Sequence, residues 1–566
     1  MPRPRLLAGK VVSALGSLLA IGAAPPQPSW NGFVHEFVET EFRLDPNFAV
    51  QQGRHDYDGR LPDWSDAGLK RRGDFLRATI AGASRFNGLT PTQAFERDYL
   101  VAVAKGQLFW LTDADRPHTN PAFYLEGGLD PAPYASRPYA DAATRLKAMI
   151  AYMKAVPAAV AQARANLRTP LPRSFIDYGV TAFGNLADYY AKDGKAAFAS
   201  VKDPVLQARY DAAAGPAAMA MKGLADWLTA NRATATETGY AMGAARFSRM
   251  LAATELVDVP LDRLEAAGRA DLARNQAAMK AACAAFAPGV TITACIAKAA
   301  LDKPVDGPVA AARAQVPMLR KFVLDRNLLT IPGTEQALVA QAPPYNAQNF
   351  AYIDPPGPFD RGVPSIYYIA PPDPHWSKAQ QDAYIPSKGI LLFTTVHEVM
   401  PGHFVQFLHS NRTTSEIGRL FVGYAFAEGW AHYCEQMMWD AGLADGDPAI
   451  HVGQLSEALL RDVRFLSAIG LHARGMTEDV SRRMFLEDAY QDEGNAEQQA
   501  RRGTYDPAYL NYTLGKLMIL KLREDWTASH GGRAAWKPFH DAFLSFGGPP
   551  IPLVRRAMMA NGSPAL

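Results

Sequence analysis

The sequence predicts a large, mainly α-helical protein with a small β-sheet before its metal-binding helix, arranged as two lobes around a deep cleft. Apolar residues recur at spacings of three and four over residues 30–330, the period of amphipathic helices. Short segments with β-branched and aromatic residues follow residue 328, and helical periodicity returns over 386–540. We therefore predict an N-terminal helical lobe over 25–330 and a catalytic lobe over 331–566, with one continuous domain as the alternative.

The individual elements follow from local composition. Helices are predicted from runs rich in Ala, Leu, Arg and Glu, separated by Pro and Gly clusters. Four apolar segments are predicted as strands, and the prolines between them keep the sheet small. The last strand, 365–370, is expected at a sheet edge beside the cleft, where an extended peptide could add by main-chain hydrogen bonds. The clearest helical runs are 144–156, 204–230 and 262–286, and the predicted strands are 328–332, 337–342, 349–353 and 365–370.

Composition excludes several classes of protein. Of the 566 residues, 48% are hydrophobic and 20% are charged, which is typical of a globular protein rather than a disordered or fibrous one. The 58 basic and 56 acidic residues give a formal net charge of +2, so no nucleic-acid partner is expected. The sequence leaves the oligomeric state open.

The N-terminal segment has the pattern of a secretory signal peptide. Arg3, Arg5 and Lys10 make its start basic, and residues 11–24 form an apolar run that ends in small residues. We expect residues 1–24 to be removed and the mature protein to be periplasmic or secreted, without a membrane span. No Cys follows the apolar run, so a lipid anchor is not expected. An uncleaved N-terminal anchor is the alternative reading.

Two of the three cysteines are predicted to form a disulfide. Cys283 and Cys295 are twelve residues apart and flank Pro288-Gly289, in a segment that reads as helix, turn and helix. An exported protein can keep such a bridge. Two buried thiols in Ala-rich helices are the alternative. Cys434 lies elsewhere in the chain and is expected to be a small buried residue.

Residues 397–403, His-Glu-Val-Met-Pro-Gly-His, form the most specific motif in the chain. In the common zinc-hydrolase motif His-Glu-x-x-His, both histidines share one helical face at i and i+4. Here the second histidine is at i+6, about 240° away on a regular helix. Pro401 and Gly402 disfavour a regular helix, because proline breaks the hydrogen-bond ladder and glycine accepts unusual dihedral angles. An irregular turn at these residues could return His403 to the side of His397.

A second polar pattern follows the motif. Glu428, His432 and Glu435 share one helical face at i, i+4 and i+7, among apolar neighbours. Such a face is costly to bury without a partner or a metal, and an exposed polar stripe is the alternative. A hydrolytic zinc site needs three protein ligands and an open position. Two helical turns, about 10 Å, separate Glu428 from Glu435, so one ion does not readily hold both carboxylates.

The chain resembles the bacterial family known as domain of unknown function 885. Its members share His-Glu-x-x-Pro-Gly-His, found here at 397–403, followed by Glu-Gly-Trp-Ala-x-Tyr-x-Glu, found here at 428–435. Segments 53–65, 470–472 and 512–516 also fit the family, so the resemblance covers most of the mature chain. The family in turn resembles helical gluzincin-type zinc metallopeptidases.

This resemblance implies roles for the motif residues. His397, His403 and Glu428 would be the zinc ligands, and Glu398 would be the general base. Glu435 would then orient a ligand histidine or contact the amino group of the substrate. His432 departs from the family pattern, where we expect an apolar residue, and would be either a partner of a ligand or an extra ligand.

The residues then predict a chemistry. A zinc-activated water and Glu398 would hydrolyse a peptide bond. Tyr512 and His472 are candidate donors to the oxyanion, with ordinary packing of each side chain as the alternative. Arg464 and Arg523 could pair with a substrate carboxylate, but no role is assigned to them because most helical arginines are solvated.

The expected partner is a peptide or a small amide. Two other functions are compatible with the same motif: a zinc amidase acting on a non-peptide C–N bond, and a non-catalytic metal-containing binding protein. The intact Glu398 argues against the second of these, because a structural metal site has no need of a base.

Overall fold

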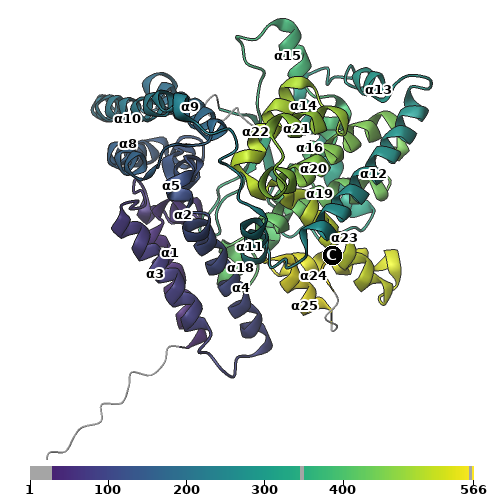
Figure 1. Ribbon diagram of the computed structural model, residues 1–566, viewed down its shortest axis with the longest axis horizontal. Coiled ribbons are helices and arrows are strands. Elements are labelled where there is room, and N and C mark those ends of the chain that lie inside the picture. The colour runs from purple at the N-terminus through teal and green to yellow at the C-terminus, as the bar shows by residue number, and fades with distance from the viewer. Residues whose placement is uncertain (1–28, 344–349, 560–563) are drawn as a thin grey trace, which may run out of the picture.

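The computed structural model describes residues 29–343, 350–559 and 564–566. The predicted signal peptide, residues 1–24, lies outside this range. The described chain is mainly helical, with one three-stranded sheet, as the sequence predicts (Figure 1). None of its described helices combines the length and apolar composition that a membrane span needs.

The N-terminal helices form the first of two large hydrophobic cores, drawn purple to blue in Figure 1. Phe42, Tyr152 and Phe183 are among its fully buried side chains. The helices are α1 (Trp30–Leu44), α2 (Pro46–Gln51), α3 (Asp66–Ala83), α4 (Pro91–Leu108), α5 (Arg116–Thr119), α6 (Ala122–Tyr124), α7 (Ala132–Ala135), α8 (Ala142–Asn166), α9 (Arg173–Asp188) and α10 (Pro204–Ala230).

Helices from the middle and the end of the chain form the second core. The middle of the chain contributes α11 (Ala244–Thr254), α12 (Leu261–Phe286), α13 (Ile292–Ala299) and α14 (Gly307–Asp325). The remainder contributes α16 (Lys388–Glu398), α17 (His403–Ser410), α19 (Tyr424–Asp440), α20 (Pro448–Ala473), α21 (Glu478–Glu487), α22 (Glu493–Tyr505), α23 (Asn511–Ala528), α24 (Trp536–Ser545) and α25 (Ile551–Met558). Two short helices differ: α18 (Glu416–Leu420) packs into the first core, and α15 (Lys378–Tyr384) has no buried residue.

The border between the cores differs from the predicted lobe boundary at 330. The helices over 244–325 belong to the second core, where α12 packs along α20. Gly268 allows this approach, since a side chain there would meet the ring of Phe465. The change of composition near residue 330 marks the start of the sheet. It does not mark the border between the cores, which lies near residue 240, where the Ala-rich composition is the same on both sides. Phe421, from the segment after residue 420, packs into the first core, where its carbonyl accepts a hydrogen bond from Tyr99.

A disulfide joins Cys283 near the end of α12 to Cys295 in α13, as predicted, with the two Cα atoms 5.7 Å apart. The bridge closes a short loop around Pro288-Gly289. A loop of this size stabilises the fold by roughly 3 kcal/mol when the unfolded chain is constrained. The third cysteine, Cys434, is buried and unpaired among the described residues, as expected.

The sheet has the order β1-β3-β2, from β1 (Ala337–Gln341), β2 (Ala351–Asp354) and β3 (Ser365–Ile369). β3 pairs in parallel with β1 and antiparallel with β2. Two strand predictions are therefore wrong. Residues 328–332 form no strand, because Leu328 and Leu329 are buried as part of a connecting segment. Segment 365–370 is not an edge strand: β3 is central and fully buried, and β2 lies at the edge. Asn349, the first residue of the strand predicted over 349–353, lies outside the described residues.

Candidate metal centre

The two histidines of the motif lie on two successive helices. α16 begins at a capped end, where the Ser387 hydroxyl accepts a hydrogen bond from the Ile390 amide, and it ends at Glu398. After a turn of four residues α17 begins at His403. The rings of His397 and His403 are 4.8 Å apart and nearly perpendicular. The sequence predicted an irregular turn within one helix, whereas the interruption is complete and brings the two rings together.

Gly402 allows this turn. Its amide donates a hydrogen bond to the Val396 carbonyl at 3.0 Å, which folds the turn back onto α16. A Cβ atom at this position would lie 1.8 Å from the His397 carbonyl oxygen, a backbone atom that has little freedom to move. The chain at position 402 therefore has room only for glycine.

We expect Gly402→Ala to lower the free energy of unfolding by about 2 kcal/mol or more and to abolish metal binding. The backbone would have to shift next to the ring of a candidate metal ligand. Gly223→Ala in α10 is the matched control, since nothing lies within 4 Å of its added methyl group. Thermal unfolding and metal content would be measured on both variants. A Gly402→Ala protein as stable and as metal-rich as the control would show that the tight turn is incidental.

Glu428 completes a group of three potential metal ligands. Its Oε2 atom lies 3.2 Å from His397 Nε2 and 3.4 Å from His403 Nε2. One donor atom from each of the three residues lies within 4.8 Å of the others. Glu428 is carried on α19, which touches α23 backbone to backbone, because a Cβ on Gly429 would lie 2.4 Å from the Gly515 Cα atom.

Electrostatics keep the Glu428 carboxylate ionised. Burial alone would raise its pKa, but the facing His403 and His397 rings hold the pKa well below its usual range. The pKa of His397 is raised to about 9, because hydrogen bonds to Glu428 and Glu435 outweigh the effect of burial. The buried carboxylates around His397 therefore stabilise a positive charge at this position, whether a proton or a metal ion.

Glu435 contacts the other nitrogen of His397. Its Oε1 atom lies 2.7 Å from His397 Nδ1 and 3.3 Å from Arg461, and the side chain is completely buried. Burial would raise the Glu435 pKa, but Arg461 and His397 hold it far below its usual range. An ionised Glu435 accepts the Nδ1 hydrogen, so that Nε2 is the nitrogen that offers a lone pair once the ring loses its second proton, as it would on binding a metal ion. The two acids thus lie on opposite edges of one ring.

Glu398 lies between the histidines and the sheet. Its Oε2 atom accepts a hydrogen bond from the Ile353 amide of β2 at 3.0 Å, and the side chain is 9% exposed. Burial raises its pKa, and the nearby histidines only partly offset that effect. Because the Ile353 amide points away from β3, the outer edge of β2 faces the candidate base.

Tyr512 also belongs to this site. Its ring stacks on His397 with centroids 6.2 Å apart, and Tyr424 packs against it at 5.9 Å. Burial and then the Glu428 carboxylate raise the Tyr512 pKa. The phenol therefore keeps its proton and is a hydrogen-bond donor beside the three candidate ligands.

The other two predicted site residues lie apart from the ligands. The Nε2 atom of His472, the other candidate oxyanion donor, bonds to the Gly503 carbonyl at 2.7 Å, and its ring stacks on Phe247. His432 is buried 3.5 Å from Glu435 and is not one of the three clustered ligands. Burial, together with the nearby Lys516, lowers the His432 pKa to about 3, so this histidine is neutral.

Sequence reasoning missed two contributors to the site. The Ile353 amide carries no side-chain signal, and its role depends on the pairing of β2. Arg461 lies one helical turn before Arg464, and both are under a tenth exposed. Arg523 lies outside the site, where it donates to the Tyr433 hydroxyl and stacks on Trp536.

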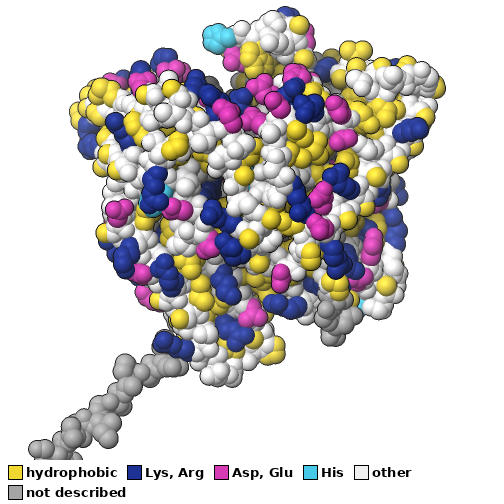
Figure 2. Space-filling view, in the orientation of Figure 1, with side chains coloured by type: hydrophobic (Ala, Val, Ile, Leu, Met, Phe, Trp, Pro, Cys, Tyr) yellow, Lys and Arg dark blue, Asp and Glu magenta, His cyan; other side chains and the backbone are white. Residues whose placement is uncertain are grey.

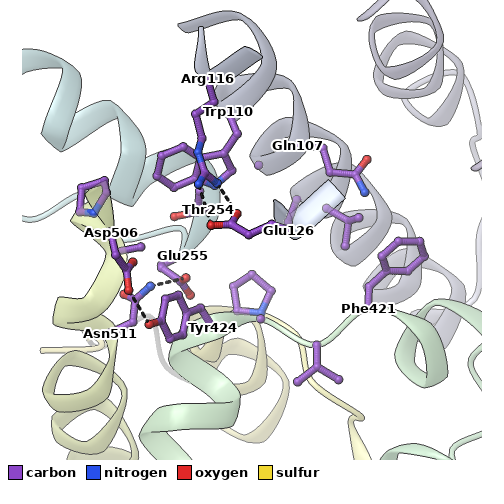
Figure 3. Close-up of a pocket in the computed structure, with 18 of the residues that line it drawn as sticks. Gln107, Trp110, Arg116, Glu126, Thr254, Glu255, Phe421, Tyr424, Asp506 and Asn511 are labelled. Atoms are coloured by element: carbon purple, nitrogen blue, oxygen red, sulfur yellow. Dashed lines mark hydrogen bonds and ion pairs between the residues drawn. The ribbon is translucent and has the colours of Figure 1, made fainter. Parts of the chain in front are cut away.

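A pocket of about 550 Å³ lies beside the candidate metal centre, where the two hydrophobic cores meet. Tyr424 and Asn511 line one side of it, and Trp110 and Arg116 line the other (Figure 3). None of the three candidate ligands lines the pocket, but Tyr424 lies one helical turn before Glu428. On the face shown in Figure 2, basic and acidic side chains are interspersed and no extended basic area forms.

Comparisons with known proteins extend this description. A family model described as a bacterial protein of unknown function (DUF885) matches residues 46–558. A provisionally assigned lipoprotein of unknown function from Shewanella oneidensis has a similar structure, with a TM-score of 0.75, 24% identity and coverage of 94% of this chain and 100% of its own. A provisionally assigned lipoprotein from Colwellia psychrerythraea also has a TM-score of 0.75, with 16% identity and coverage of 94% and 99%. No curated protein matches the chain significantly.

Proposed function

The chain belongs to the bacterial DUF885 family of proteins of unknown function, and we propose that it is a zinc-dependent hydrolase of peptide bonds. One observation carries this proposal. His397, His403 and Glu428 converge on a single point, and a buried carboxylate, Glu398, adjoins the first of them in the chain.

The donor set suits zinc. Two imidazole nitrogens and one carboxylate oxygen form a common catalytic zinc set that leaves a position open. With bonds of roughly 2.0–2.1 Å in tetrahedral geometry, two ligand atoms are about 3.3 Å apart. The Glu428 oxygen lies 3.2 and 3.4 Å from the two histidine nitrogens. Because Glu435 accepts the Nδ1 hydrogen of His397, the Nε2 lone pair is directed toward the same point.

The surrounding residues have the roles that amide hydrolysis requires. A zinc ion at this position would activate water and polarise the scissile carbonyl. Glu398 would accept the proton of the attacking water and pass it to the leaving amine, and its raised pKa suits a group that carries a proton for part of the cycle. Tyr512 would donate a hydrogen bond to the oxygen on which negative charge develops.

The edge of β2 favours a peptide over a small non-peptide amide. In a strand, the backbone amide and carbonyl groups of every second residue point to the same side. The amide and carbonyl groups of Ala351 and Ile353 therefore both point away from β3. The Ile353 amide is bonded to Glu398, but an extended peptide could pair with the rest of this edge by main-chain hydrogen bonds, which would place a backbone amide next to Glu398. A small amide without a peptide backbone would gain little from that edge.

We also propose that the protein is exported. The signal-like segment over 1–24, the Cys283–Cys295 disulfide and the lipoprotein descriptions of the two structural neighbours support a place in the cell envelope or outside the cell.

Metal analysis combined with a peptide assay tests the proposed function. We expect the purified protein to bind about one zinc per chain, as a three-ligand site does, and to cleave members of a mixed peptide library. A chelator should remove both the metal and the activity, and added zinc should restore them. A protein that takes up no transition metal on reconstitution, or that carries zinc but cleaves no peptide, would contradict the proposal.

A further inference from the structure

Arg464 is a buried cation beside the metal centre. It lies on α20, it is 8% exposed, and its Nε atom donates to Gln499 Oε1 at 2.7 Å. Within the described ranges no carboxylate oxygen lies within 4.0 Å of its guanidinium nitrogens. A buried charge without a counter-charge is costly, and an anion from outside the protein would offset that cost.

The two neighbouring arginines do have counter-charges. Arg461 pairs with Glu457 at 2.9 Å, and Arg502 pairs with Asp506 at 3.0 Å. Among these three arginines, Arg464 is therefore the one whose positive charge no carboxylate of the described residues balances. Burial lowers the pKa of Arg464, and repulsion from Arg502 lowers it further. Both effects would be relieved by a bound anion.

Tyr512 connects Arg464 to the candidate ligands. The Arg464 guanidinium carbon lies 4.9 Å from the centre of the Tyr512 ring, and the same ring stacks on His397. The guanidinium and the His397 ring therefore lie 4.9 Å and 6.2 Å from the centre of the same Tyr512 ring. An extended peptide advances about 3.3–3.6 Å per residue, so roughly one to three residues span these distances between the scissile bond and an anion held at Arg464.

We infer that Arg464 binds the free C-terminal carboxylate of a peptide substrate, so that the protein removes roughly one to three residues from the C-terminus. This inference rests on the proposed function and specifies its substrate class. A guanidinium presents paired N–H donors that match a carboxylate. Gln499 accepts the hydrogen bond from Nε of Arg464, so the two terminal nitrogens of the guanidinium are left for the substrate.

The test compares one N-acylated tripeptide in two forms, with a free C-terminal carboxylate and with a C-terminal amide. The native protein should hydrolyse the free acid about 10- to 100-fold faster in kcat/KM, since hydrogen bonds to charged groups have about this effect. Arg464→Gln should remove the preference by slowing only the free acid, and Arg464→Lys should keep part of it. Arg483→Gln, an exposed change on α21, is the matched control. Zinc content and circular dichroism would establish that each variant is folded.

Binding provides a readout that is independent of turnover. Calorimetry on the Glu398→Gln protein should show tighter binding of the free acid than of the amide, and the added Arg464→Gln change should abolish the difference. Equal hydrolysis of both forms by the native protein would overturn the carboxylate role and leave the proposed function standing. An equal loss on both forms in Arg464→Gln would instead assign Arg464 to positioning Tyr512. Selective binding of the acid without any hydrolysis would overturn the proposed function and leave the carboxylate site standing.

Discussion

Glu398→Gln should reduce peptide turnover by about 10²-fold or more while the protein keeps about one zinc per chain. Glutamine has the size of glutamate, and its side-chain oxygen can still accept the hydrogen bond from the Ile353 amide. The change therefore preserves the packing between α16 and β2 and removes only the basic oxygen. Glu398 is not one of the three clustered ligands, so the metal content should not change.

Single-turnover rates at saturating zinc, together with the metal content of the same sample, would measure this effect. Glu487→Gln makes the same chemical change at an exposed position on α21 and should behave like the native protein. If Glu398→Gln hydrolysed the peptide at the native rate, another group would have to be the base.

Glu428→Ala should lose the metal and with it all hydrolysis, whereas Glu435→Gln should keep a metal site that is weakened by about 10- to 100-fold. The two acids contact different nitrogens of the same ring. Glu428 lies beside the Nε2 atoms of both histidines, and Glu435 lies beside Nδ1 of His397 alone. Removing the first takes away a ligand, and changing the second only loosens the orientation of a ligand.

Zinc affinity measured by competition with a coloured chelator would separate the two variants. Both replacements lie in one helix and in one buried site, so each is a control for general disruption by the other. Metal retained in Glu428→Ala and lost in Glu435→Gln would transfer the ligand role to Glu435. That result would require a different arrangement of the centre.

The sequence predicted the chemistry-bearing residues better than the architecture around them. Residue types and spacing indicated His397 and His403 as candidate ligands, because few combinations of side chains bind a metal, and the family resemblance selected Glu428 over Glu435. The structure brings these three residues together. The disulfide was predictable for a similar reason, since two cysteines flank a turn. The order of the strands in the sheet was not predictable, because the apolar pattern of β3 fits a central strand as well as an edge strand.

Long-range packing decided the remaining differences. His472 and Tyr512 looked alike in sequence, as polar rings in helical segments. The Gly503 carbonyl engages His472, while the stacking of Tyr512 on His397 depends on how α16 meets α23. The charge environment of Arg464 could not be predicted either. It is set by segments far apart in the chain, and a sequence does not reveal which carboxylates approach a given arginine.

The contact between Gly429 and Gly515 has a consequence for how the site can move. Two backbones that touch without intervening side chains leave α19 and α23 almost no freedom to slide or rotate against each other. Glu428 and Tyr512 are carried on these two helices and therefore behave as parts of one stiff block. Movement of the site around a substrate would then come from the facing elements, such as the edge strand β2. The protein would thus hold one wall of its site fixed and admit substrate by displacement of the other.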